Sequence, residues 1–255
     1  MNNVGIIPAR MDSSRFPGKP MVKINGIPMI GHVYHRSKMA NILDEVYVAT
    51  CDQEIEDYVS GIGGEVVMTS SSHERASDRV AEAVLIVEER IGKEIDIVVL
   101  IQGDEPMVFP EMIEIALQPL LNDESTKVSN IMTECRSEEE WQDPNEVKVV
   151  VDNESNALYF SREPIPSKKK YSGNFPAYKQ VCIIPFTRDC LLDYTELEPT
   201  RLEMIESVDM NRLIEHGFKV KMVLTEQSTF AVDTPKDLKN VERLMKEDTL
   251  RVRYS

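Results

Sequence analysis

Three cationic side chains lie close together in the first loop of the sequence. Arg10, Arg15 and Lys19 follow a short apolar segment that we interpret as a buried strand. Guanidinium forks and an ammonium group can together contact several phosphate oxygens, as a triphosphate requires. The loop is not a Walker A motif, because Pro20 follows the Gly18-Lys19 pair and the earlier glycine is missing. The alternative is a solvated basic turn, but in so acidic a chain we favour anion binding.

A carboxylate follows another apolar segment of the chain. The continuous apolar run Ile97–Ile101 predicts a buried strand, and Asp104 comes shortly after it in the sequence Gln102-Gly103-Asp104-Glu105-Pro106. An aspartate at this place can hold a magnesium ion that bridges phosphate oxygens. Taken alone, the segment is better explained as an ordinary turn between a strand and a helix.

A second carboxylate precedes the predicted last helix. Thr234 is suited to the N-cap of this helix, Pro235 to its first position, and Asp237 to completing a capping box. Asp233 would then stand just outside the helix, where it could be a second metal ligand. The segment alone leaves that role open.

Other reactive side chains give weaker signals. His32 and His35 lie three residues apart without a third ligand nearby, so we expect packing histidines and no zinc site. The four cysteines have no CxxC spacing, and we expect free thiols in a reducing compartment. No triad for nucleophilic catalysis has convincing spacing.

The first part of the chain alternates strands and helices with short connections. This pattern predicts a mainly parallel α/β sheet covered by helices on both faces, with ligands at the carboxyl ends of the strands. The predicted strands are Val4–Ile7, Glu45–Thr50, Glu65–Met68 and Ile95–Ile101, and the predicted helices are Met29–Met39, Glu54–Ser60 and Ser77–Glu89.

The pattern changes after about residue 128. We predict a hairpin of Val147–Val151 and Ala157–Ser161, and a mobile Pro-, Lys- and Gly-rich loop over Pro164–Tyr178. The remaining predicted elements are a strand Gln180–Phe186, a helix Arg201–His216, a strand Lys219–Leu224 and a helix Pro235–Lys246.

Bulk composition excludes several classes of protein. The 255 residues carry a formal net charge of −15, which argues against a broad nucleic-acid surface. No apolar stretch approaches the roughly 20 residues that span a bilayer, and no signal peptide is recognisable. We therefore expect a cytoplasmic protein with no membrane partner.

The motifs together resemble those of the 3-deoxy-manno-octulosonate (KDO) cytidylyltransferase family, over nearly the whole chain and in the family's order. The first loop together with the QGDEP sequence is the specific part of this resemblance. The matching segments are Pro8–Pro20, Met29–Tyr34, Ala49–Asp52, Ser77–Glu82, Gln102–Pro106, Leu158–Arg162 and Val232–Pro235.

The resemblance implies a homodimeric α/β nucleotidyltransferase that joins CMP from CTP to an acidic sugar, releases pyrophosphate and serves cell-surface polysaccharide synthesis. It implies Mg²⁺ on Asp104 and Asp233, and catalytic roles for these two residues, Lys19 and Arg15. The residues implied at the nucleotide are Pro8, Ala9, Arg10, Ser13, Arg15, Lys19, Asp52, Ser77, Arg79 and Gln102. Those implied at the sugar are Gln102, Arg162, Gln180 and Glu206.

In this reading, residues 1–130 and 217–255 form mainly a nucleotide-binding core, and residues 131–216 form a β-rich part for sugar binding and dimerisation. Within the single cytidylyltransferase domain, the departures from the family pattern fall on the sugar side. Gln180, Ile184 and Met210 stand where the family usually has His, Tyr and Gln, and the family's S-G-T near the base is Arg75-Ala76-Ser77.

These departures leave the acceptor open. A lost polar partner changes selectivity steeply, so we expect KDO not to be the best acceptor and favour a KDO-like sugar such as amino-KDO. The alternatives are a synthase for a nonulosonic acid and a catalytically silent nucleotide-binding protein of the same fold. A glycosyltransferase is disfavoured because no DxD motif follows a strand.

Overall fold

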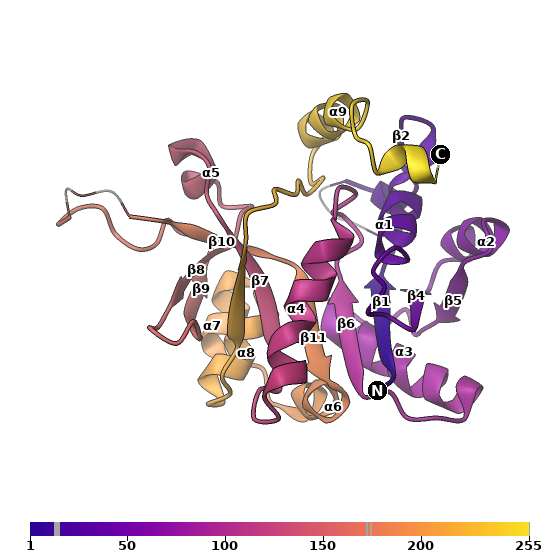
Figure 1. Ribbon diagram of the computed structural model, residues 1–255, viewed down its shortest axis with the longest axis horizontal. Helices are drawn as coiled ribbons and strands as arrows, with labels where there is room; N and C mark the ends of the chain where they lie inside the picture. Colours follow the sequence, from indigo (N-terminus) through magenta and orange to yellow (C-terminus); the bar gives the residue numbers. More distant parts are fainter. Residues whose placement is uncertain (13–15, 172, 174, 255) are drawn as a thin grey trace. The chain divides into compact units, whose positions relative to one another are not determined.

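The computed structural model describes residues 1–12, 16–171, 173 and 175–254. It divides into two compact units: Met1–Glu114 with Thr229–Ser255, and Ile115–Ser228. The yellow C-terminal part of the chain therefore belongs with the indigo N-terminal part, although the sequence separates them (Figure 1). The assignment of the nucleotide and the sugar to separate parts of the chain remains a prediction.

The first unit contains a parallel sheet with the strand order β6-β1-β4-β5. Its strands are β1 (Asn3–Pro8), β4 (Glu45–Thr50), β5 (Glu65–Met68) and β6 (Ile97–Ile101). All five side chains of β6 are buried, as expected for a parallel strand covered on both faces. The predicted strand Ile95–Ile101 is thus confirmed except for its first two residues.

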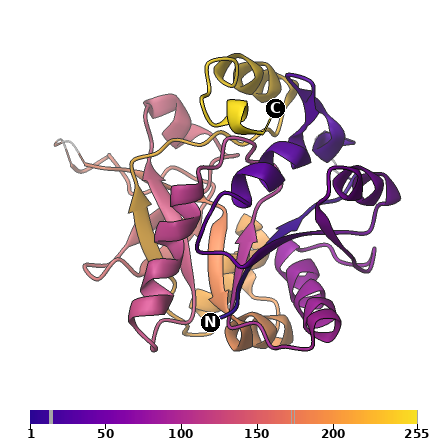
Figure 2. The same ribbon diagram turned by 45° about the vertical axis from the view of Figure 1, so that its right-hand side comes forward.

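Helices cover both faces of this sheet. Helix α1 (Met29–Ser37) connects β1 to β4, and α2 (Gln53–Gly61) connects β4 to β5, so both crossovers lead toward the same edge of the sheet. Helix α3 (Ala76–Ile91) leads in the opposite direction, from β5 back to β6. Because crossovers between parallel strands are right-handed, α3 lies on the face opposite to α1 and α2 (Figure 2). The predicted fold class, an α/β protein with a mainly parallel sheet, is confirmed.

Smaller elements complete the first unit. A 3-10 helix (Lys19–Met21) precedes the hairpin of β2 (Lys23–Ile24) and β3 (Ile27–Pro28), which the sequence analysis missed. Helix α9 (Pro235–Leu244) follows the second unit, and a 3-10 helix (Arg251–Arg253) comes near the chain end. Helix α4 (Pro110–Asn122) was also missed, and the boundary between the units falls within it.

The second unit is built on a mixed sheet with the order β12-β7-β10-β8-β9. The hairpin of β8 (Lys148–Val151) and β9 (Ala157–Ser161) confirms the predicted one. Strand β7 (Ser129–Glu134) pairs in antiparallel fashion with β10 (Tyr178–Val181) and in parallel fashion with β12 (Lys221–Thr225). The β-rich character expected for this part of the chain is confirmed.

The prediction of one strand over Gln180–Phe186 was wrong, because the chain forms β10 and then β11 (Ile183–Thr187), with a break at Cys182. The side-chain amide of Asn130 donates to the carbonyl oxygens of Val181 and Ile183, at 2.7 and 3.1 Å. A buried side chain thus satisfies the carbonyl groups on both sides of the break. Local strand propensity does not reveal that a side-chain amide takes the place of a backbone partner here.

The prediction of one helix over Arg201–His216 was also wrong. The structure has α7 (Arg201–Glu206) and α8 (Asp209–Glu215), separated by Ser207 in the left-handed region at φ 53°. The remaining helices of this unit are α5 (Glu138–Gln142) and α6 (Arg188–Glu196).

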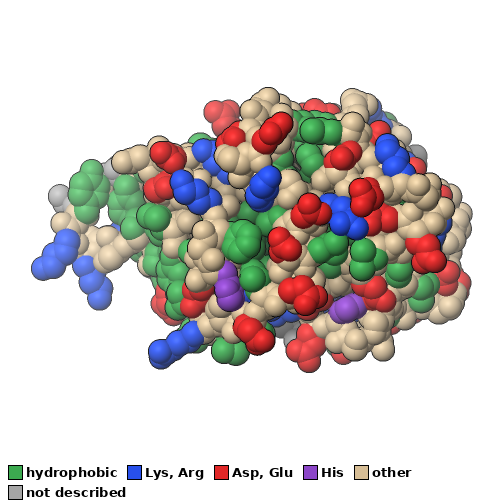
Figure 3. Space-filling view, turned by 90° about the horizontal axis from the view of Figure 1, so that it is seen from below, with side chains coloured by type: hydrophobic (Ala, Val, Ile, Leu, Met, Phe, Trp, Pro, Cys, Tyr) green, Lys and Arg blue, Asp and Glu red, His purple; other side chains and the backbone are tan. Residues whose placement is uncertain are grey.

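The surface and the cysteines agree with the composition. On the face drawn in Figure 3, Asp and Glu side chains are scattered among isolated Lys and Arg side chains. All four cysteines are free, and burial raises the pKa of Cys135 to about 11 and of Cys190 to about 12. Among the described residues, no helix combines the length and the apolar character needed to cross a bilayer.

Candidate functional site

The loops that follow β1 and β6 meet at the carboxyl end of the parallel sheet. The two strands are parallel neighbours, so their loops leave from the same edge. The contact requires glycine at position 103, because a Cβ there would stand 2.9 Å from the carbonyl oxygen of Pro8. The close approach places the Gln102–Asp104 segment against the start of the cationic loop.

Lys19 lies between the two predicted metal ligands. Its Nζ is 2.7 Å from Oδ2 of Asp104 and 2.9 Å from Oδ1 of Asp233, and the three side chains are only 11 to 19% exposed. Burial alone would lower the pKa of Lys19, but the charges of the two carboxylates outweigh it and raise the pKa. Residues separated by 85 and 214 positions therefore form one compact charge cluster.

Local backbone contacts position the cationic loop. Gly18 takes the left-handed conformation at φ 72° just before the 3-10 helix of Lys19, and its N–H donates to the Met11 carbonyl at 3.0 Å. The N–H of Met11 donates to Oδ2 of Asp52 at 2.8 Å. Asp52, which we expected near the nucleotide, thus anchors the backbone of this loop.

The capping box of α9 positions Asp233, as its sequence predicts. The Thr234 hydroxyl accepts from the Asp237 N–H, the Asp237 carboxylate accepts from the Thr234 N–H at 2.8 Å, and Pro235 occupies the first turn. The N–H of Val232 donates to the Asp104 carbonyl at 2.9 Å. This bond holds the segments that carry the two carboxylates side by side.

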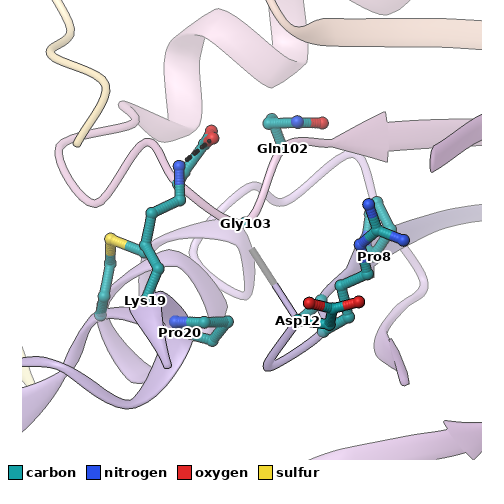
Figure 4. A pocket seen from close by; sticks show the side chains of 10 residues that line it. Pro8, Asp12, Lys19, Pro20, Gln102 and Gly103 are labelled. Atoms are coloured by element: carbon teal, nitrogen blue, oxygen red, sulfur yellow. Dashed lines mark hydrogen bonds and ion pairs between the residues drawn. The ribbon is translucent and has the colours of Figure 1, made fainter. Parts of the chain in front are cut away.

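Two neighbouring cavities share four lining residues, Pro8, Ala9, Arg10 and Gln102, and the first of them adjoins this cluster. The first has a volume of about 250 Å³ and is also lined by Asp12, Lys19, Pro20, Met29, Gly103 and Asp104. Figure 4 shows the Gln102 side chain and the Lys19 side chain at the edges of this cavity, with Asp12 opposite Lys19. The sequence analysis missed Asp12 and Met29, although both lie within or beside recognised motifs.

The second cavity has a volume of about 200 Å³ and lies beside the start of α3. Its further lining residues are His73, Glu74, Arg75, Ala76 and Arg79. Arg79 is 3% exposed, and its Nη1 donates to the hydroxyl of Thr69 and the carbonyl of Ser70. Among the described residues, its Nη2 has no hydrogen-bond partner. A buried orphan donor at a cavity wall is suited to an acceptor atom of a ligand.

Two of the described residues that we predicted at the nucleotide, Asp52 and Ser77, line neither cavity. Ser77 is buried in the first turn of α3. Ser13 and Arg15 lie outside the described residues.

Two of the predicted sugar residues meet in the second unit. The backbone N–H of Arg162 donates to Oε2 of Glu206 at 2.8 Å, and its Nε donates to the Glu206 carbonyl at 2.7 Å. The Tyr159 and Ser161 hydroxyls donate to Oε1 of Glu206. Burial alone would raise the pKa of Glu206, but these hydrogen bonds outweigh it and lower the pKa. The carboxylate thereby joins β9 to the end of α7.

The three departures from the family pattern differ in exposure. Met210 is fully buried and Ile184 is 5% exposed, so both side chains belong to the interior of the second unit. Gln180 is half-buried on β10, and its Nε2 donates to Oδ1 of Asn130 at 2.6 Å. Of the three departures, Gln180 therefore keeps a partly accessible polar group.

The chemistry of the charge cluster fits a divalent cation of the magnesium type. Two carboxylates already converge on one cationic group, the Lys19 ammonium. In the described part of the chain, no three His, Cys, Asp or Glu side chains gather as a metal cage. Magnesium commonly takes one or two carboxylates and completes its shell with water and substrate phosphates.

Comparisons with known proteins bear on the same site. The family model described as cytidylyltransferase matches residues 4–230. The 3-deoxy-manno-octulosonate cytidylyltransferase of Geobacter metallireducens is 41% identical over 96% of this chain and 98% of its own length. The protein of that name from Syntrophobacter fumaroxidans is 42% identical over 98% and 99%.

Solved structures give the same result. The CMP:2-keto-3-deoxy-manno-octonic acid synthetase complexed with CTP is 38% identical and superimposes with a TM-score of 0.88, covering 97% of this chain and 99% of that one. A putative glucose-1-phosphate thymidylyltransferase from Bacillus anthracis has a TM-score of 0.66 at 17% identity, covering 97% and 96%, and shares the fold alone.

Proposed function

Because the chain belongs to the 3-deoxy-manno-octulosonate cytidylyltransferase family, we propose that it transfers CMP from CTP to an acidic 3-deoxy-2-keto sugar and releases pyrophosphate. The protein is a nucleotidyltransferase. In the proposed reaction a sugar hydroxyl attacks the α-phosphorus of CTP. A bond forms between this oxygen and the α-phosphorus, and the hydroxyl gives up its proton to solvent. The bond from the α-phosphorus to the oxygen that bridges to the β-phosphorus breaks, so that pyrophosphate leaves. The product serves the synthesis of a cell-surface polysaccharide.

The observation that carries the proposal is the placement of Lys19 with Asp104 and Asp233 beside a cavity that Arg10 also lines. Nucleotidyl transfer requires mainly correct positioning and neutralisation of phosphate charge. Lys19 and Arg10 can contact the β- and γ-phosphates and stabilise the charge that builds on the leaving pyrophosphate. Arg79 and Gln102 can donate to the nucleotide from the wall of the second cavity.

Asp104 and Asp233 would hold a magnesium ion. When bound, the ion would offset phosphate charge and polarise the phosphoryl group under attack. Because Lys19 lies between these carboxylates, its ammonium would turn toward the triphosphate as the carboxylates take the metal. We therefore expect two positions of this side chain, one without and one with nucleotide.

A KDO-like acceptor with an amino substituent is supported by Gln180. The amide nitrogen of Asn130 donates to two backbone carbonyls, so its oxygen accepts from Nε2 of Gln180. This orientation leaves the carbonyl oxygen of Gln180 as a hydrogen-bond acceptor. A hydroxyl or an ammonium group on the sugar can donate to it, and the ammonium gives the stronger, charge-assisted bond.

The assembly and location of the protein follow from the same proposal. We infer a homodimer in the cytoplasm, where CTP is available. Light scattering coupled to size-exclusion chromatography tests the dimer, and a monomer at micromolar concentration would contradict it.

Pyrophosphate release with purified protein tests the function. CTP should support release with magnesium and a 2-keto-3-deoxy sugar acid, while ATP, GTP and UTP should support much less. KDO, its amino-substituted analogue and several nonulosonic acids are compared by kcat/KM. If none of the sugar acids in this panel supports pyrophosphate release, the proposed acceptor class is wrong. If release does not require CTP, the proposed nucleotide substrate is wrong. If KDO is the most efficient acceptor by tenfold or more, the proposal of an amino-substituted acceptor is wrong.

A further inference from the structure

A buried network of side chains joins helix α1 to the C-terminal segment, and its members do not line either nucleotide cavity. Its centre is Arg36, whose side chain is fully buried. The guanidinium donates from Nε to the Tyr254 hydroxyl at 3.0 Å and from Nη1 to the Val108 carbonyl at 3.3 Å. It also forms an ion pair with Asp248. One side chain of α1 thus contacts both the turn at Val108 and the C-terminal segment, residues 248–254.

The hydrogen bonds of this network have a defined direction. Nε2 of His32 is 2.9 Å from the Ile24 carbonyl, which can only accept, so this nitrogen carries the proton. Burial lowers the pKa of His32 to about 4, so the ring is neutral at physiological pH and its Nδ1 is an acceptor. The Tyr254 hydroxyl, 3.0 Å away, donates to Nδ1 and accepts from Arg36. His35 stacks on the Tyr254 ring with centroids 5.2 Å apart.

One end of the network fixes the segment that carries Lys19. The Ile24 carbonyl, held by His32, belongs to β2, which follows the 3-10 helix of Lys19 after a single residue. Between them, the N–H of Val22 donates to the Lys19 carbonyl at 3.2 Å, and the Val22 carbonyl accepts from Met29 at 2.9 Å. A shift of β2 would therefore move the backbone of Lys19.

The other contacts reach the segments that carry the two carboxylates. Val108, whose carbonyl accepts from Arg36, ends the turn that begins at Glu105, directly after Asp104, and its N–H closes this turn on the Glu105 carbonyl at 3.1 Å. Asp248 follows α9, whose N-terminus positions Asp233. Apolar packing joins the same segments, since the residues Ile24, Met29, Met107, Val232, Val241 and Met245 form one buried cluster.

From these contacts we propose that Tyr254 is a positioning residue for nucleotidyl transfer. Its hydroxyl completes the chain from Arg36 through His32 to Ile24, and this chain sets the place of Lys19 relative to Asp104 and Asp233. The inference rests on the proposed function of that cluster. Tyr254 itself touches no reacting atom, so it acts through the geometry of the three charged groups.

The Tyr254→Phe variant tests this role. It keeps the ring and its stack on His35 but removes the hydroxyl, so Nε of Arg36 and Nδ1 of His32 each lose a partner. Displacement of Lys19 from its place should lower kcat about tenfold at saturating CTP and sugar acid, because positioning errors act on the reacting geometry. Calorimetry without metal should show the dissociation constant of CTP raised about threefold with unchanged stoichiometry.

Ser37→Ala is the matched control. The Ser37 hydroxyl is fully buried in the same helix and donates to the Val33 carbonyl at 2.8 Å, but it lies outside the network. This variant should lose comparable thermal stability and keep kcat within about twofold. His35→Ala, which removes the stack on Tyr254 and an edge contact with Tyr34 but no hydrogen bond of the network, should do the same. Arg36→Lys, which keeps the charge near Asp248 but loses the fork, should reproduce the effect of Tyr254→Phe.

The outcomes separate positioning from a structural role. The proposal is overturned if Tyr254→Phe is only less stable, or has a smaller fraction of active molecules, while kcat and CTP affinity per binding site stay normal. If Tyr254→Phe folds poorly, a normal kcat in Arg36→Lys overturns it equally. Wild-type protein that neither binds CTP nor forms product would overturn the proposed function and this inference together.

Discussion

Replacing Lys19 by Met would leave the carboxylates of Asp104 and Asp233 facing each other without the ammonium between them. Their facing oxygens can be at most about 5.6 Å apart, because they lie 2.7 and 2.9 Å from the same nitrogen. Two like charges at this separation repel by about 3 kcal/mol at an effective dielectric constant of about 20. We expect the variant to lose up to about this much free energy of unfolding at neutral pH and low salt.

A divalent cation should reverse this loss without any nucleotide. Magnesium at about a hundred times its dissociation constant would return about 2.7 kcal/mol through preferential binding to the folded state. The wild-type protein should gain much less, because Lys19 already lies between the carboxylates. The measurement is urea unfolding with and without magnesium for both proteins, and Lys23→Met, at an exposed lysine four residues further on, is the control.

The reasoning would be refuted if Lys19→Met were as stable as Lys23→Met, or if magnesium stabilised wild type and Lys19→Met equally. Either result would mean that the two carboxylates do not form a cation site in the free protein. The readout is independent of catalysis.

Three further predictions concern the two units separately. Asp104→Asn and Asp233→Asn should each lower kcat by at least about a hundredfold in steady-state assays with magnesium, because a metal ligand and preorganised charge are lost; near wild-type turnover would exclude that residue as a ligand. Glu206→Gln should be less stable than wild type at neutral pH, and the difference in stability should disappear as the pH falls below the ordinary glutamate pKa of 4.5. The reason is that the pKa of Glu206 is lowered in the folded state, so the ionised carboxylate contributes stability that is lost on protonation. Thermal unfolding across pH checks this, and a gap independent of pH would contradict it. Gln180→Leu should lower kcat/KM for an amino-substituted acceptor about tenfold more than for KDO, because a charge-assisted hydrogen bond is lost. If kcat/KM falls equally for both acceptors, Gln180 does not contact the sugar substituents.

The sequence was sufficient to predict the parallel sheet and the loops that carry the charge cluster. The signals were local: apolar segments of strand length, a cationic loop after the first of them, and the capping residues Thr234 and Asp237. Carboxyl ends of parallel strands meet at one edge, so the proximity of Lys19 and Asp104 followed from topology. The capping box likewise fixed Asp233 at a helix start.

The features that escaped prediction depend on contacts between distant residues. Asn130 supports the break near Cys182, and no local pattern at that strand reveals it. The left-handed conformation of Ser207 divides a helix whose composition reads as continuous. The link from Arg36 to Tyr254 joins residues 218 positions apart. Such pairings are decided by the folded backbone, so single-sequence patterns do not contain them.

The proposed reaction transfers the α-phosphorus of CTP to a sugar acid. It is tested most directly by incubating the protein, magnesium and a 2-keto-3-deoxy sugar acid with CTP that is labelled at the α- or the γ-phosphate. We expect the α-label to appear in a CMP-sugar of the expected mass and the γ-label to appear only in pyrophosphate. Label from the γ-phosphate in the sugar product, or no labelled sugar product with any acid of the panel, would contradict it.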